Sequence, residues 1–103
     1  MDSENNQKND FPQQPNGVLK KNFDEEFREV KEIFAHNLKA YRKSQKISQK
    51  RLSEVSGVAK ITIKNIETSK ENVTIKTILK LAIALDKFYY NFLKEKVDKD
   101  LLR

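Results

Sequence analysis

Between Phe23 and Arg103 the chain contains no proline and only one glycine, Gly57. These two residue types most often interrupt regular structure, so their near absence favours long helical segments. Both prolines and the other glycine fall in the first 22 residues, among Asn, Gln and charged side chains. Such a segment buries too little apolar surface to offset its ordering entropy. We therefore expect a disordered tail over residues 1–22 and one domain over residues 23–103.

Apolar side chains recur every three or four positions over residues 24–45, which predicts a first helix with one buried face. Asn22 or Asp24 is a suitable N-cap for it. A second helix follows, with Ser48 as its N-cap and Gly57 as the left-handed residue that ends it. The apolar face of the first helix consists of Phe23, Phe27, Val30, Phe34, Leu38 and Tyr41.

Two similar hexapeptides, ITIKNI at 61–66 and VTIKTI at 73–78, alternate β-branched and polar residues like the strands of a hairpin. The alternation fails at the last isoleucine of each, which falls on the opposite face of a strand. The connection between them also lacks the glycine that two-residue hairpin turns favour. We predict that both are helix beginnings, the second capped by Thr74. The core-facing residues predicted for this fourth helix are Ile75, Ile78, Leu79, Ala82 and Leu85.

The last segment places apolar residues four positions apart and predicts a fifth helix. The chain is therefore expected to be all-α. In the final helix we expect Phe88, Tyr90 and Leu93 to close the core. We expect the opposite surface to join two subunits, with Tyr89, Phe92, Val97 and Leu101 at the dimer interface.

Positive charge is concentrated in the middle of the chain. The formal net charge is +6, but residues 36–70 hold nine Lys and Arg against two acids, whereas residues 23–35 hold five acids against two bases. A focused basic block indicates a polyanion as partner, although a face of solubilising lysines is the alternative.

The second helix, the tight glycine turn and the third helix, over residues 48–68, form a helix–turn–helix pattern. At 100° per residue, Ile63 and Ile66 of the third helix share a buried side, which leaves Ile61, Lys64 and Asn65 facing outward. Asn can pair with adenine, Lys can donate to guanine, and an apolar side chain can contact the thymine methyl. This face therefore suits the major groove of DNA.

Residues 33–93 resemble the Cro/lambda-repressor-like (XRE-type) helix–turn–helix family. The resemblance implies a compact five-helix bundle of the lambda-repressor-like DNA-binding type, which binds double-stranded operator DNA as a homodimer. Its most specific part is Ser-Gln shortly before a Leu, with Ile-x-x-Ile-Glu beyond the glycine turn. The matching residues are Leu38, Arg42, Ile47, Ser48, Gln49, Leu52, Ser56, Gly57, Val58, Ile63, Ile66, Glu67, Ile75, Ile78, Leu81, Ala82 and Leu85.

The resemblance also implies roles for individual side chains. Arg42 and Glu67 match a pair that often forms a buried salt bridge, so Arg42 is expected to be structural. Four departures from the family pattern are Ser53, Ala59, Ser69 and Val73. Ala59 removes a helix cap, and Ser69 replaces a glycine at a position that requires a positive φ. The predicted base-reading residues are Gln49, Lys60, Ile61, Lys64 and Asn65, and the predicted phosphate contacts are Lys43, Lys46, Lys50, Thr62, Thr68 and Lys70.

Enzymatic chemistry is not expected. Cysteine is absent and His36, predicted to be a solvated surface residue, is the one histidine, so no metal cluster or Cys/His pair can form. No signal segment or membrane-spanning run is visible, which predicts a cytoplasmic protein with no membrane, cofactor or small-molecule ligand. We predict a transcription regulator, specifically a repressor. The alternative is an antitoxin-type or restriction–modification controller protein, with a protein as the main partner in the antitoxin case.

Overall fold

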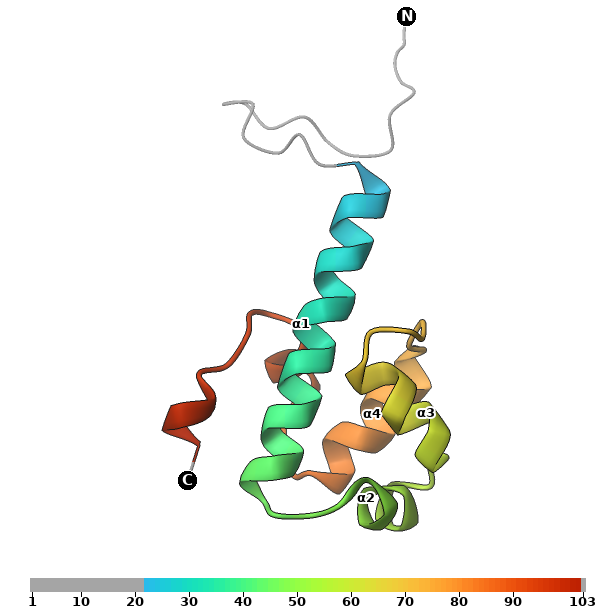
Figure 1. Cartoon of the computed structure of the whole chain (residues 1–103), viewed down its shortest axis with the longest axis vertical. Coiled ribbons are helices and arrows are strands. Elements are labelled where there is room, and N and C mark those ends of the chain that lie inside the picture. The colour runs from blue at the N-terminus through green and yellow to red at the C-terminus, as the bar shows by residue number, and fades with distance from the viewer. Residues whose placement is uncertain (1–21, 103) are drawn as a thin grey trace, which may run out of the picture.

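The computed structural model describes residues 22–102, which form four α-helices and two short 3₁₀ helices (Figure 1). The predicted tail lies outside these residues except for Asn22, so the division into tail and domain stays a prediction. No strand occurs in the described part, which confirms the all-helical class. The elements are α1 (Phe23–Ser44), α2 (Gln49–Ser56), α3 (Lys60–Glu67), α4 (Ile75–Ala84), η1 (Tyr89–Phe92) and η2 (Lys99–Leu101).

Side-chain caps set the starts of three helices. Asn22 Oδ1 accepts a hydrogen bond from the Glu25 amide at 2.8 Å, and Ser48 and Thr74 cap α2 and α4 in the same way. Such a cap satisfies a backbone N–H that has no partner within the helix. As predicted, Ala59 gives α3 no side-chain cap. The first turn of α3 therefore keeps backbone donors that no side-chain cap occupies.

All four helices end next to a left-handed residue. Gly57 has φ 78° after α2, whereas Lys46, Ser69 and Asp86 adopt φ of 55–61° after α1, α3 and α4. After each of these three, two backbone N–H groups return to carbonyls of the last helical turn, the Schellman pattern. The expectation that Ser69 requires a positive φ is thus met. The geometry of this ending tolerates non-glycine residues at a local steric cost.

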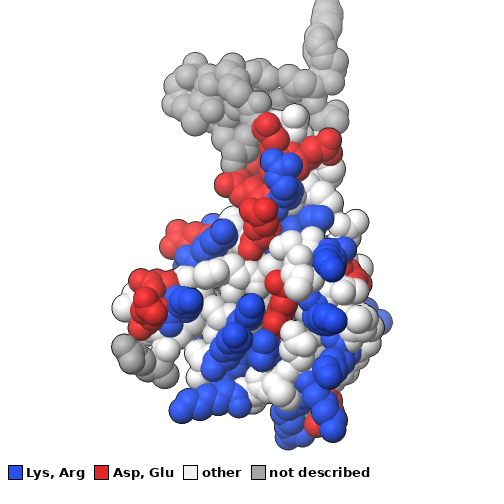
Figure 2. All heavy atoms as spheres, in the orientation of Figure 1, with Lys and Arg blue, Asp and Glu red and all other residues white. Residues whose placement is uncertain are grey.

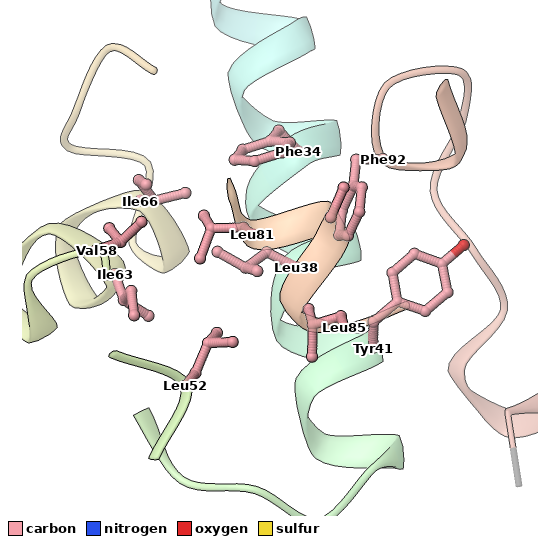
Figure 3. Packing of buried hydrophobic residues seen from close by; sticks show 11 residues of the cluster. Phe34, Leu38, Tyr41, Leu52, Val58, Ile63, Ile66, Leu81, Leu85 and Phe92 are labelled. Carbon is pink, nitrogen blue, oxygen red and sulfur yellow. The ribbon is translucent and has the colours of Figure 1, made fainter. Parts of the chain in front are cut away.

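One apolar cluster joins all four helices and η1 (Figure 3). Phe92 is its aromatic centre, with ring centroids 5.6 Å from Phe34 and 5.1 Å from Tyr41. Burial raises the pKa of the Tyr41 phenol above its ordinary value of 10.0. The assignment of Phe92 to a dimer interface is wrong, because its side chain is fully buried. Other fully buried residues are Leu38, Leu52, Ile63, Leu81 and Leu85.

The inward face of α4 is rotated from the predicted one. Leu81 is fully buried, whereas Ile75 is 76% exposed and Leu79 is 42% exposed, so their assignment to the core is wrong. The buried face centres between Ile78 and Leu85, and at 100° per residue this centre places Ile75 and Leu79 on its flank. Phe88 and Tyr90, also expected in the core, are exposed, because Phe92 fills that position instead.

The predicted fifth helix is wrong, because between α4 and Leu102 the described chain forms only the short 3₁₀ helices η1 and η2. Asn37 of α1 explains this outcome. Its buried Nδ2 donates to the carbonyls of Phe92 at 2.9 Å, Glu95 at 2.8 Å and Asn91 at 3.2 Å, and its Oδ1 accepts from the Val97 amide at 2.8 Å. These backbone groups bind α1 instead of forming a helical ladder. We call residues 93–102 the C-terminal arm.

His36 makes a second connection to this arm. Its Nε2 lies 2.8 Å from the Val97 carbonyl oxygen and donates to it, since a carbonyl oxygen only accepts. The side chain is half-buried, so the prediction of a solvated surface histidine is wrong. The helical wheel missed the contact because it considers only apolar neighbours.

The N-terminal part of α1 projects beyond the bundle (Figure 1). Phe23 and Phe27 stack there with ring centroids 5.5 Å apart, and they are 61% and 36% exposed. None of the helices over residues 22–102 has the length and apolar character needed to cross a membrane.

Candidate nucleic-acid interface

The two short helices α2 and α3 are joined by a turn whose geometry depends on Gly57. Its backbone N–H donates to the Ser53 carbonyl at 2.9 Å while its φ of 78° reverses the chain. No atom lies within 4 Å of the position that a Cβ would take. The requirement for glycine is therefore conformational rather than steric crowding. This turn orients α3 across α2.

Helix α3 divides the predicted hexapeptide between core and solvent. Ile63 and Ile66 are 0% and 2% exposed, whereas Ile61 is 60% exposed. Lys64 is also exposed, and Asn65 is half-buried at the edge of the same face. The structure therefore brings together an apolar, a cationic and an amide side chain on one free helical surface, which the sequence predicted as the base-reading face. Lys60 lies exposed at its N-terminal end.

A buried ion pair fixes the orientation of α3. Arg42 donates through Nε to Glu67 Oε2 at 2.7 Å and through Nη2 to Glu67 Oε1 at 3.0 Å. Their side chains are 10% and 3% exposed. Arg42 Nη1 also donates to the Ile47 carbonyl at 2.9 Å, which adds the α1–α2 loop to the network. The predicted pair is thus present, and it ties the C-terminal end of α3 to α1.

Gln49, a predicted base-reading residue, contacts this ion pair. Its Nε2 donates to Glu67 Oε1 at 3.0 Å. The contact positions the side chain at the N-terminus of α2 and leaves its amide oxygen as an acceptor. Gln49 therefore connects the start of α2 to the end of α3, and its side chain remains partly exposed to solvent.

The other predicted polar contacts are held differently. Asn65 Nδ2 lies 3.5 Å from Glu71 Oε1, which is too long for a strong hydrogen bond. The Thr68 hydroxyl donates to carbonyls of its own helix, Lys64 at 3.0 Å and Asn65 at 3.2 Å. Thr62 is half-buried. Asn65 is thus the least constrained amide on this face, whereas Thr68 offers only its oxygen lone pairs.

Charge on the visible face separates along the long axis of the molecule (Figure 2). Lys and Arg side chains gather toward the end that carries α2, whereas Asp and Glu are more numerous than Lys and Arg on the projecting part of α1. The predicted phosphate-contacting lysines are all exposed, and no carboxylate among residues 22–102 lies within ion-pair distance of them. They are Lys43, Lys46, Lys50 and Lys70.

The predicted dimer residues do not form one surface. Tyr89 and Leu101 are exposed, Val97 is half-buried against the core, and Phe92 belongs to the core. A different apolar stripe is exposed on α4, at four-residue spacing. Apolar periodicity does not reveal it, because the periodicity predicts Ile75 and Leu79 on the inward face. The α4 stripe consists of Ile75, Leu79 and Ile83, which are 76%, 42% and 77% exposed.

Asn37 is the other residue that sequence reasoning missed. It is fully buried, and an amide in an apolar helical face was the available signal.

Among residues 22–102, no three His, Cys, Asp or Glu side chains are grouped as metal ligands.

Comparisons with known proteins identify relatives that share the helix–turn–helix region. Residues 38–87 match a family model described as helix-turn-helix. Control protein C.SmaI of Serratia marcescens is 40% identical over 60 residues, which cover 58% of this chain and 71% of that protein. The crystal structure of the restriction-modification controller protein C.AhdI from Aeromonas hydrophila superposes with a TM-score of 0.59 and 30% identity, over 61% of this chain and 96% of that one.

A further solved structure, that of the hypothetical transcription factor NHTF from Neisseria, has a TM-score of 0.62 at 24% identity. The match covers 64% of this chain and 76% of that chain. At this identity the likeness speaks for the fold alone.

Proposed function

Because the chain belongs to the XRE-type helix–turn–helix family of DNA-binding regulators, we propose that it represses transcription by occupying a palindromic operator as a homodimer. The observation that carries this proposal is the free face of α3. It presents a cation, an amide and an exposed isoleucine from a helix whose other side is fixed by the core and by the Arg42–Glu67 pair. A rigid helix with unsatisfied polar groups is what base recognition requires.

In this proposal α3 lies in the major groove. Asn65 pairs with an adenine edge, Lys60 and Lys64 donate to guanine, and Ile61 contacts a thymine methyl. Gln49 reaches the DNA from the N-terminus of α2. Phosphate contacts then set the register of the protein on the duplex. These contacts come from Lys43, Lys46, Lys50, Thr62, Thr68 and Lys70.

Selection of bound sites from random double-stranded DNA tests this function. We expect enrichment of an inverted repeat whose half-sites lie about one helical turn, ~34 Å, apart. Affinity for the selected site should fall steeply with salt because lysines replace condensed counterions. A library without an enriched motif, together with a salt-independent affinity, would overturn the proposal.

The α4 stripe supports the homodimer, and we propose that it joins the two subunits together with the neighbouring Phe88 and Tyr89. Ile75, Leu79 and Ile83 expose apolar surface in a row that nothing in residues 22–102 covers. A second copy would bury the same row against itself, as an isologous two-fold interface does. Light scattering at micromolar concentration should report twice the chain mass. A glutamate at Leu79 should shift it to the monomer, whereas a glutamate at the distant Phe23 should not.

A restriction–modification controller is the more specific candidate. It is favoured by the names of two similar proteins, the control protein C.SmaI and the restriction-modification controller protein C.AhdI. In that role the chain would bind a promoter next to restriction and modification genes. This role is tested by identifying the neighbouring genes and by measuring the activity of their promoter with a reporter in the presence and absence of the protein. The antitoxin alternative predicts that alanine at Lys60, Lys64 and Asn65 leaves a protein partner bound, whereas the DNA-binding proposal predicts loss of the operator complex.

A further inference from the structure

A groove separates α1 from the C-terminal arm. It has a volume of about 490 Å³ and is lined by α1 on one side and by η2 with the residue after it on the other. Ala40 and Leu102 give it an apolar part, and the polar part comes from lysines. Concave sites that bind small molecules in other proteins have volumes of about 300–1,000 Å³. The groove is therefore large enough to hold a ligand of modest size.

Three ammonium groups and one carboxylate line the groove, from Lys39, Lys43, Lys99 and Asp100. Lys39 and Lys43 are one helical turn apart, where two like charges repel each other. No carboxylate among residues 22–102, Asp100 included, lies within ion-pair distance of any of the three lysines. The lining therefore carries an excess of positive charge that the carboxylates of the described residues leave unpaired. An anion in the groove would relieve this repulsion.

The Ser44 and His36 side chains in the lining already have partners. The Ser44 hydroxyl donates to the Tyr41 carbonyl at 2.8 Å, and His36 Nε2 donates to the Val97 carbonyl. The lysines are thus the donors that remain for a ligand. Among residues 22–102 no arginine lines the groove, and its described cations are lysines, which do not offer the planar two-bond recognition typical of carboxylates. Compact ammonium charges on both sides of the groove suit a phosphate group.

This site is distinct from the helix–turn–helix face. Arg42 points toward α3, and its neighbour Lys43 is rotated by about 100° around α1. Two of the three groove lysines, Lys39 and Lys99, are outside the set proposed to contact operator phosphates. We infer that the groove between α1 and η2 is a phosphate-binding site. Its ligand is either a free phosphate compound or a backbone phosphate of DNA that flanks the operator.

Two arms of one experiment distinguish these sources. In the first, the full chain without DNA is titrated with inorganic pyrophosphate and followed by residue-resolved NMR. Saturable shifts are expected in residues 36–44 and 99–102. The double variant Lys39→Gln/Lys99→Gln should weaken binding by about tenfold or more, since bonds to charged groups are the stronger class. Saturation here assigns the site to free phosphate and overturns the prediction of no small-molecule ligand.

In the second arm, a selected operator duplex is compared with one extended by several base pairs at both ends. If the groove takes flanking DNA, the longer duplex binds more tightly. The double variant should lose this gain, and its salt slope should fall by about 1.8, because two phosphate contacts are lost. Affinity for the short duplex should remain unchanged.

The matched control is Lys76→Gln/Lys96→Gln, which removes the same charge from exposed positions outside the groove. Binding of pyrophosphate or of the longer duplex that the groove variant loses and the control variant retains supports the site. An equal loss of binding in both variants overturns the site, and so does the absence of both pyrophosphate binding and a gain from the longer duplex.

Discussion

Almost the same six-residue sequence occurs near the start of α3 and near the start of α4, yet the two copies have different roles. In α3 the hexapeptide ITIKNI lies entirely inside the helix, whereas in α4 the hexapeptide VTIKTI runs across the helix start. Thr62 is therefore a helical residue, but its counterpart Thr74 is an N-cap. The buried Ile63 corresponds to Ile75, which is 76% exposed.

The difference shows that position relative to a cap decides the role of a residue more than local sequence does. Relative to the hexapeptide, the helix starts three residues later in α4 than in α3, a shift that corresponds to about 300° of helical rotation. In α3, Ile63 and Ile66 are buried while Lys64 faces outward. In α4, the equivalent Ile75 is exposed and only Ile78 packs against the core. The residue after each hexapeptide diverges too, since Glu67 is buried in an ion pair and Leu79 is exposed.

The largest expected effect on stability concerns Glu67, a buried acid that has no equivalent in α4. Arg42→Ala would leave the Glu67 carboxylate buried and unpaired, at a cost of about 3–5 kcal/mol in the free energy of unfolding. Arg51→Ala is the control, because the Arg51–Glu54 pair is exposed and contributes at most about 1 kcal/mol. Chemical denaturation measures both. Similar small losses would mean that the pair does not hold α3.

The isoleucine pair is the next test of the comparison. Ile63→Ala should cost about 2–5 kcal/mol because it leaves a cavity in the core. Ile75→Ala should change the stability of the monomer by no more than about 0.5 kcal/mol. Denaturation at concentrations where the chain is monomeric separates them. Equal losses would show that the two copies play the same part in the core.

Binding of DNA should respond to only one of the two copies. Asn65→Ala should cost about 1–3 kcal/mol in affinity for the selected operator and relax the preference at one base pair. Thr77→Ala, the same position in α4, should leave DNA affinity unchanged. Competition with point-mutated operators measures the effect. Uniform weakening on every operator would instead assign Asn65 to a phosphate.

The smallest effect is expected from the threonines. Thr74→Ala removes the cap that accepts a hydrogen bond from the Thr77 amide at 3.1 Å, and it should cost about 1 kcal/mol. Thr62→Ala should cost less, since alanine is the better helix former at an interior position. Thermal unfolding of the two variants checks this order, and a reversed order would contradict the assignment of the caps.

Most helix boundaries were predictable because local chemistry fixes them. Asn22, Ser48 and Thr74 cap helices, and Gly57 ends one, through contacts within a few residues in sequence. The ion pair was predictable only through the family resemblance, since Arg42 and Glu67 are 25 residues apart. The outward face of α3 followed from its helical rotation.

The segment after α4 was not predictable from periodicity. Its conformation depends on Asn37, which lies 55 residues before Phe92, and no local pattern reports such a contact. The four-residue spacing there indicated a helix, but the backbone groups that a helix would use are bound to α1. The rotation of α4 was missed for a similar reason, because Leu79 and Leu81 are equally apolar and only the tertiary packing selects Leu81.

The attachment of the C-terminal arm through Asn37 has a thermodynamic consequence for the groove that it closes. The arm has no α-helix of its own, so it is held by hydrogen bonds to the Asn37 amide and to His36 and by the packing of Leu93, Val97 and Leu102 against the core. Segments attached in this way open as units while the remaining core stays folded. A ligand that bridges α1 and η2 binds only the closed form. Closure and ligand binding are then coupled, so phosphate should slow hydrogen exchange in the arm, and a weakened Asn37 attachment should lower phosphate affinity in proportion to the closed fraction that is lost.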